Sequence, residues 1–258
     1  MIILATTISN GQSSTVFHSS FEQIAFSSED PLQILLASDP EVNVDKYNLY
    51  QEDITQIVDK LKAKQSKWSD SKLLEKIFYY VHNKKLDWYE NYITLADLME
   101  NGTYDCLTGT AFYALILDEL EIPYTIYEFD FHVFLVAKLP SDSALFESTD
   151  PLYGFVTDPD EIEEHINYYL TGDANTTGRQ IVIGSRATSS QKSTVNERIS
   201  LKELVGLQYY NLAVNAFNNR EIAVSRDFIE KAYQLYPSQR ISDTRDFFLS
   251  SRRIVSLY

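Results

Sequence analysis

The chain has 258 residues and a net charge of −15 at neutral pH, with 44% hydrophobic and 23% charged residues. This balance is typical of a globular protein with enough apolar side chains for a core. Because the negative charge repels polynucleotides, we expect no nucleic-acid partner. The single cysteine cannot form an internal disulfide or a zinc site of several thiolates. The four histidines show no metal-ligand spacing, so we expect no metal and no cofactor.

The N-terminal sequence MIILATTISNGQSS is a short apolar run that turns polar. It is similar to the remnant of a secretory signal that lacks its basic start, and the alternative is a frayed or edge segment of a folded domain. On this basis we favour export, to the periplasm or outside the cell, over the cytoplasm. No stretch of the sequence is long and apolar enough to span a bilayer. Residues 1–49 are assigned to an N-terminal segment.

Apolar residues with helical spacing form two stripes between residues 50 and 81, which predicts two helices. Ser69 and Asp70 are the candidate N-caps of the second helix. A loop with a short helix at 94–99 follows. The next helix opens at Cys106, the only cysteine of the chain, directly after a turn-like Asn-Gly-Thr.

After Pro123 the apolar period changes to two, and the residues are rich in β-branched and aromatic types. This pattern predicts one long strand, or two strands with a bend. A turn is expected at SDSA, residues 141–144, and LFESTDP is expected to form the next strand. The acidic residues 158–165 are interpreted as the first turn of a helix rather than as a metal site. Helices followed by strands indicate an α+β fold.

Residues 171–200 are mostly polar and turn-forming, so we interpret them as a linker or surface excursion with one short strand at 181–183. Residues 201–258 show two helical stripes around NNRE, which predicts a helical hairpin. This appendage resembles a single tetratricopeptide unit. The resemblance is carried by Tyr209, Leu212, Ala213, Ala232 and Pro237. An ordinary helical hairpin is the alternative. We expect the hairpin to pack on the main domain, and a protein partner is one further use of these helices, although no feature marks a peptide-binding groove.

The thiol of Cys106 lies at the start of a helix, where unpaired N–H groups favour a negative charge and therefore the thiolate. A nucleophile also needs a base and a group that orients the base. His132 lies in the predicted strand FDFHVFLVA, and Asp150 ends the strand LFESTDP. If these strands pair through the turn at 141–144, the two side chains lie almost opposite each other. We therefore predict a Cys106–His132–Asp150 triad.

The segments YDCLTGTAFYALILDELEIPY, FHVFLVA and LFESTDP together resemble the transglutaminase-like superfamily, a papain-like group. The resemblance covers about residues 50–155 and implies that Cys106 is the nucleophile, His132 the base and Asp150 the orienting acid. It also implies a papain-like core, assigned to residues 50–170, in which the cysteine-bearing helix packs on an antiparallel sheet.

The predicted activity is thiol-dependent acyl chemistry on a peptide or protein substrate, as a peptidase or amidase rather than by transfer to an amine. The alternative is a non-catalytic scaffold of the same fold, or a protein-binding module. Each of the three residues has a structural explanation as well. A lone cysteine is often a small buried side chain, His132 can be a core residue, and Asp150 can be a turn residue. His82 and His165 are interpreted as helix-surface residues without a role.

Overall fold

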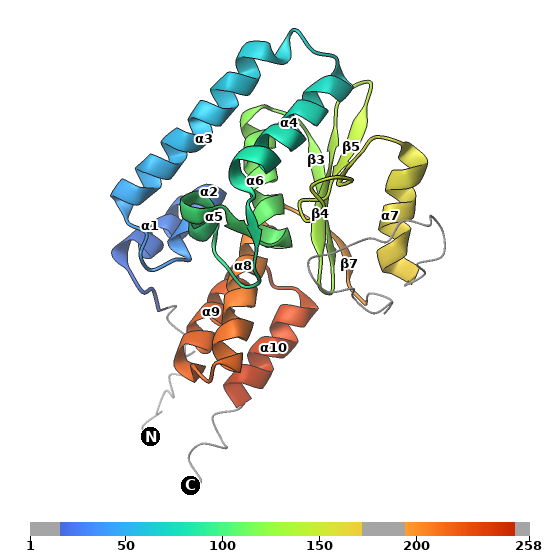
Figure 1. Ribbon diagram of the computed structural model, residues 1–258. Helices are drawn as coiled ribbons and strands as arrows, with labels where there is room; N and C mark the ends of the chain where they lie inside the picture. Colours follow the sequence, from blue (N-terminus) through green and yellow to red (C-terminus); the bar gives the residue numbers. More distant parts are fainter. Residues whose placement is uncertain (1–15, 172–193, 251–258) are drawn as a thin grey trace, which may run out of the picture.

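The computed structural model describes residues 16–171 and 194–250, in which helices surround an antiparallel sheet (Figure 1). The helices are α1 (Ser20–Ser28), α2 (Pro31–Ala37), α3 (Val44–Gln65), α4 (Asp70–Lys85), α5 (Leu95–Asn101), α6 (Cys106–Glu119), α7 (Pro159–Thr171), α8 (Leu201–Asn218), α9 (Ile222–Leu235) and α10 (Gln239–Ser250). The strands are β1 (Trp88–Tyr89), β2 (Thr103–Tyr104), β3 (Tyr124–Phe129), β4 (Val133–Lys138), β5 (Ser143–Phe146), β6 (Phe155–Val156) and β7 (Asn196–Ile199). The expected α+β class is confirmed at this level.

The main sheet has the strand order β6-β5-β4-β3-β7, and every neighbouring pair is antiparallel. Helix α6 packs against β4, while α7 packs against β5 on the other face of the sheet (Figure 1). The short strands β1 and β2 pair in parallel beside the start of α6. The sheet therefore lies between the helix that carries the cysteine and α7.

Local sequence explains where the central helices begin. The Ser69 side chain accepts the backbone N–H of Lys72, so the predicted N-cap of α4 is confirmed. Helix α6 is buried on nearly all sides, which is why its apolar residues form no single stripe. The Asn-Gly-Thr before it ends α5 at Gly102, whose φ of +71° is readily adopted only by glycine.

Two apolar clusters hold the layers together. The larger cluster contains side chains from helices α1 through α6, from the inner face of the sheet and from the C-terminal helices. The smaller one lies between the sheet and α7 and consists of Phe129, Phe134, Leu145, Val156, Ile162 and Tyr169. The smaller cluster thus fixes α7 against the strands that flank His132.

Several expected elements are confirmed and others are corrected. The first of the two predicted helices is α3, which begins at Val44 rather than near residue 50. The region after Pro123 forms a hairpin of two strands, β3 and β4. The turn after β4 covers 139–142, so the predicted turn at 141–144 is wrong by two residues. Strand β7 pairs with β3, which the polar sequence before residue 200 did not predict. The strand predicted at 181–183 lies outside the described residues.

The C-terminal helices α8 and α9 form the expected hairpin, with NNRE at its turn, and α10 follows. Helix α8 contacts α6 and α2, and the Gln208 side chain donates a hydrogen bond to the carbonyl of Ile93 (2.8 Å). Tyr236 donates to the buried Glu128 of β3 (2.8 Å). The hairpin is therefore docked on the rest of the chain.

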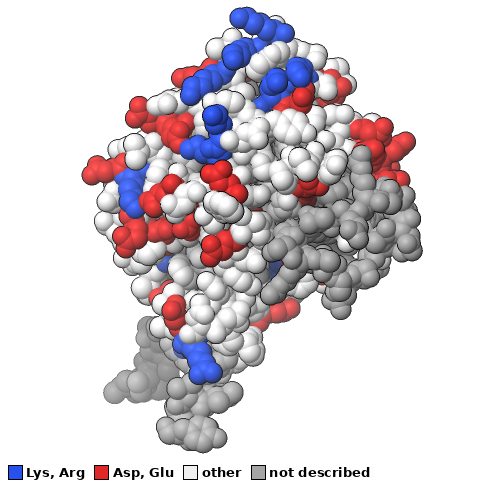
Figure 2. Space-filling model, in the orientation of Figure 1, with Lys and Arg blue, Asp and Glu red and all other residues white. Residues whose placement is uncertain are grey.

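Charge is unevenly distributed on the face drawn in Figure 2, where Lys and Arg gather near the junction of α3 and α4. Acidic side chains lie in several groups elsewhere on that face, together with a few further Lys and Arg side chains. Within residues 16–171 and 194–250, no helix has the length and apolar character needed to cross a membrane.

Candidate active site

Cys106 is the first residue of α6 and is half-buried. The preceding Asp105 caps the helix, since its carboxylate accepts the backbone N–H of Thr108 (2.8 Å) and its own N–H donates to the hydroxyl oxygen of Thr108 (2.9 Å). Burial raises the pKa of Asp105 to about 6 against the opposing effect of these hydrogen bonds. The first N–H groups of a helix have no partner within it, so the thiol lies where a negative charge is stabilised.

His132 and Glu147 form a buried pair beside this thiol. His132 Nε2 lies 2.6 Å from Glu147 Oε2, and each side chain is 3% exposed. The other carboxylate oxygen, Oε1, accepts the backbone N–H of Thr149 (3.1 Å) and its hydroxyl (2.7 Å). Glu147 is thus anchored through one oxygen and orients the imidazole through the other.

His132 and Glu147 shift each other's pKa in opposite directions. Burial alone lowers the pKa of His132, but the charge of Glu147 and hydrogen bonds with Cys106 and Glu147 raise it to about 10. Burial likewise acts to raise the pKa of Glu147, yet the charge of His132 and its hydrogen bond hold it well below the usual range. At neutral pH the ring is therefore an imidazolium and Glu147 a carboxylate.

Cys106 also interacts with the imidazole of His132. Nε2 is engaged by Glu147, while Nδ1 has no hydrogen bond of ordinary geometry within the part of the chain that the structure describes. The Cys106 side chain still contributes to the raised pKa of His132, by a hydrogen bond and by charge. Catalytic contacts are often long in resting enzymes. Nδ1 is therefore the ring nitrogen that Glu147 leaves unengaged.

Asp150 is not the partner of His132, so the predicted pairing is corrected. Its carboxylate accepts the backbone N–H groups of Leu152 (3.1 Å) and Tyr153 (2.9 Å), which makes it a turn residue. The residue that the structure brings to His132 is Glu147, which the sequence interpretation did not single out.

The end of the strand explains this correction. Leu135 pairs with Phe146, which ends β5, so Glu147 directly follows the paired strand while His132 directly precedes β4. The chain turns after Glu147, and the N–H of Asp150 donates to the carbonyl of Glu147 within that turn. The prediction extended the strand through LFESTDP to Asp150, four residues beyond the last pair.

The other histidines were also misplaced. His82 is buried, with its ring near those of Phe78 and Tyr104, so it is not a helix-surface residue. The side chain of His165 is 12% exposed, and its Nε2 lies 3.5 Å from Glu147 Oε2. Both positions follow from tertiary packing that helical spacing alone does not reveal.

Gly154 holds the backbone of Glu147 in place. The N–H of Glu147 donates to the carbonyl of Gly154 (2.8 Å), and a Cβ at Gly154 would lie 2.2 Å from the carbonyl oxygen of Glu147. Gly154→Ala is therefore expected to lower the free energy of unfolding by about 2 kcal/mol or more, because backbone atoms must move. Urea unfolding measures this change. Leu152→Ala, at an exposed position of the same turn, is the control, and equal stabilities for the two variants would contradict the expectation.

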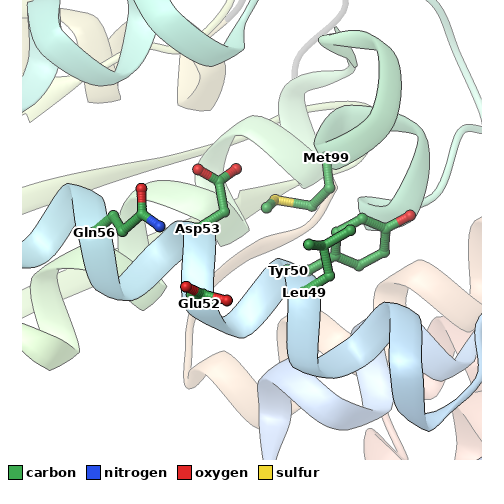
Figure 3. A pocket seen from close by; sticks show the side chains of 6 residues that line it. All are labelled: Leu49, Tyr50, Glu52, Asp53, Gln56 and Met99. Carbon is green, nitrogen blue, oxygen red and sulfur yellow. The ribbon is translucent and has the colours of Figure 1, made fainter.

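A pocket of about 380 Å³ lies away from this site, between α3 and α5 (Figure 3). It is lined by Leu49, Tyr50, Glu52, Asp53, Gln56 and Met99. Asp53 is paired with Lys85, and the hydroxyl of Tyr50 donates to Glu100. Because none of its lining residues belongs to the thiol site, we assign the pocket no role there.

Comparisons of the chain with protein families, with curated proteins and with solved structures found no match. Among the described residues, no group of three or more histidine, cysteine, aspartate or glutamate side chains is arranged to hold a metal ion. The chemistry of this site is therefore argued from the contacts of Cys106, His132 and Glu147.

Proposed function

We propose that this protein is a thiol-dependent acyl-transfer enzyme whose triad is Cys106, His132 and Glu147. The observation that carries the proposal is the buried His132–Glu147 pair, 2.6 Å apart, beside a cysteine at a helix start. A nucleophile, a base and an orienting carboxylate are the three parts that such chemistry requires. The resemblance of residues 50–155 to transglutaminase-like proteins supports the same chemistry and a papain-like core.

The reaction follows from these roles. The Cys106 thiolate attacks the carbonyl carbon of a peptide or carboxamide, and a C–S bond forms as the carbonyl electrons move to oxygen. The N–H groups at the start of α6 are placed to stabilise that oxyanion. His132 then gives its proton to the departing amine, and the C–N bond breaks to leave a thioester. Water, deprotonated by His132, attacks the thioester and releases the acid and the thiol.

We prefer water over an amine as the acceptor, because no feature of the site marks a place for an amine. The substrate class is a peptide or protein carbonyl. The alternative is a non-catalytic scaffold or binding module. It is favoured by the packing of Cys106 against the main apolar cluster, as for an ordinary buried cysteine.

Alkylation of Cys106 by iodoacetamide across pH tests the proposal. We expect rapid labelling at about pH 6, because the adjacent imidazolium stabilises the thiolate where a free thiol is protonated. His132→Ala is expected to slow labelling at that pH about tenfold or more. Mass spectrometry identifies the labelled residue, and Cys106→Ser is the blank. If labelling rises only above about pH 8 and is equally fast in His132→Ala, the non-catalytic scaffold explains the site better than an enzyme does.

A further inference from the structure

Helix α7 presents two side chains to the buried His132–Glu147 pair. His165 and Tyr169 are four residues apart, so they share one face of the helix. His165 Nε2 lies 3.5 Å from Glu147 Oε2, the same oxygen that binds His132 Nε2 at 2.6 Å. The carboxylate therefore lies between two imidazoles, one from the strand side and one from α7.

Tyr169 contacts the other member of the pair. Its ring stacks on the imidazole of His132, with centroids 5.2 Å apart and planes inclined by 15°. It also stacks on Phe129 of β3, at 4.7 Å. The Tyr169 ring thereby fixes the plane of His132 from the side of α7.

The charges of the site explain why a second imidazole is useful. A reactive state holds two anions, the thiolate of Cys106 and the carboxylate of Glu147, against one imidazolium on His132. All three lie in or at the edge of the protein interior, where an unbalanced charge is costly. His165 Nε2 is buried, and among residues 16–171 and 194–250 it has no hydrogen bond of ordinary geometry, while Glu147 Oε2 lies 3.5 Å from it.

We propose that His165 is a positioning residue that donates its Nε2–H to Glu147 Oε2 and so acts on Cys106 through Glu147 and His132. The inference rests on the proposed function. It adds a fourth residue, from α7, to the three of the proposed triad. The titratable groups in contact with His165 are Glu147, which follows β5, and Tyr169 on α7 itself. His132 binds the same oxygen of Glu147. The hydrogen bond and charge of His165 also help to lower the pKa of Glu147, after the larger effects of burial and His132.

The sign of the expected effect follows from the charges. A donor beside anions stabilises their charged forms, so its removal shifts the titration of the whole group to higher pH. In His165→Leu, the alkylation profile of Cys106 is expected to move up by about half to one pH unit, which slows labelling at about pH 6 roughly threefold to tenfold. His165→Gln keeps an N–H donor and is expected to restore most of the rate.

Asn167→Leu is the matched control, since it places the same apolar side chain on the exposed face of α7. Its profile is expected to match that of the parent protein. Urea unfolding of each variant shows whether the fold is retained. A His165→Leu profile that overlays a reactive parent, or a His165→Gln variant as slow as His165→Leu, would overturn the inference.

A second readout separates this inference from the proposed function. The imidazole resonances of His132 can be followed by NMR against pH in a Cys106→Ser background, with and without His165→Leu. We expect the His132 titration to move to higher pH when His165 is replaced. No shift, or a downward shift, overturns the inference even if Cys106 reacts rapidly. If the parent thiol is unreactive, the proposed function fails, and the His132 titration still decides the role of His165.

Discussion

Glu147→Gln is expected to slow alkylation of Cys106 at about pH 6 by about tenfold or more, whereas Asp150→Asn leaves the rate within about twofold of the parent. The reason is the protonation of His132. Burial lowers the pKa of His132, and the charge and hydrogen bond of Glu147 are among the effects that raise it to about 10. A neutral amide removes that charge, so burial prevails and the ring loses its proton at pH values where the parent ring is charged.

The pKa of His132 sets the pH range in which labelling of the two proteins is expected to differ. His132 has a raised pKa, so its imidazolium persists up to about pH 10 in the parent protein. The cation that the proposed mechanism places beside Cys106 is therefore present throughout the neutral range. In Glu147→Gln the imidazolium survives only at lower pH, and the thiolate loses its partner. The rate of iodoacetamide labelling between about pH 5 and pH 9 measures the difference.

Asp150→Asn is a strict comparison, because it makes the same chemical change three residues away. Asp150 accepts two backbone N–H groups of its own turn, and an amide oxygen can still accept them. Urea unfolding of both variants shows whether either change loosens the fold. If Asp150→Asn slows labelling while Glu147→Gln labels like the parent protein, Asp150 rather than Glu147 is the residue that orients His132.

The first half of the site was readable from the sequence. The cysteine helix and its start at Cys106 were predicted from local pattern, and the structure has both. His132 was predicted within a strand and lies directly before β4. Local signals suffice there, because a cap and an apolar run define a helix without reference to the rest of the chain.

The choice of the carboxylate beside His132 depended on where the strand after the turn ends. Glu147 and Asp150 are both acidic residues near the end of LFESTDP, and composition does not separate them. What separates them is where the strand ends. Pairing stops at Phe146, so Glu147 stays beside His132 and Asp150 lies in the turn that follows.

The contribution of α7 was beyond local reasoning. The spacing of His165 and Tyr169 shows only that both lie on one helix face, and it does not show what that face covers. Strand β7 raises the same difficulty, since its polar sequence NERI pairs with β3 at the edge of the sheet. In both cases long-range packing overrides what the segment indicates by itself.

The second large effect concerns a buried ion pair far from the thiol in sequence. Lys231 of α9 donates to both carboxylate oxygens of Glu22 in α1, each at 2.8 Å, and the two side chains are 2% and 0% exposed. The hydroxyl of Tyr209 donates to the same carboxylate (3.0 Å). This cluster joins the first described helix to the C-terminal hairpin through a fully desolvated contact.

Lys231→Met is expected to lower the free energy of unfolding by about 3–5 kcal/mol, because it leaves the Glu22 carboxylate buried without its cation. The methionine keeps most of the volume of the lysine stem, so the loss reports charge rather than a cavity. Glu22→Gln is expected to act in the same direction by leaving Lys231 unpaired. The double variant is expected to be more stable than the sum of the single changes predicts, since neither charge is then stranded. Urea unfolding gives all four values of the cycle.

The chain supplies its own control for this cycle. Lys202 of α8 pairs with Glu29, which caps the end of α1, at 3.2 Å, and these side chains are 46% and 75% exposed. Both pairs therefore bridge the N-terminal helix and the C-terminal hairpin, but only one is removed from water. Lys202→Met is expected to change the free energy of unfolding by about 1 kcal/mol or less, because water screens an exposed pair. If Lys231→Met lowered the free energy of unfolding no more than Lys202→Met does, the buried ion pair with Glu22 would not be what stabilises the contact between α1 and α9.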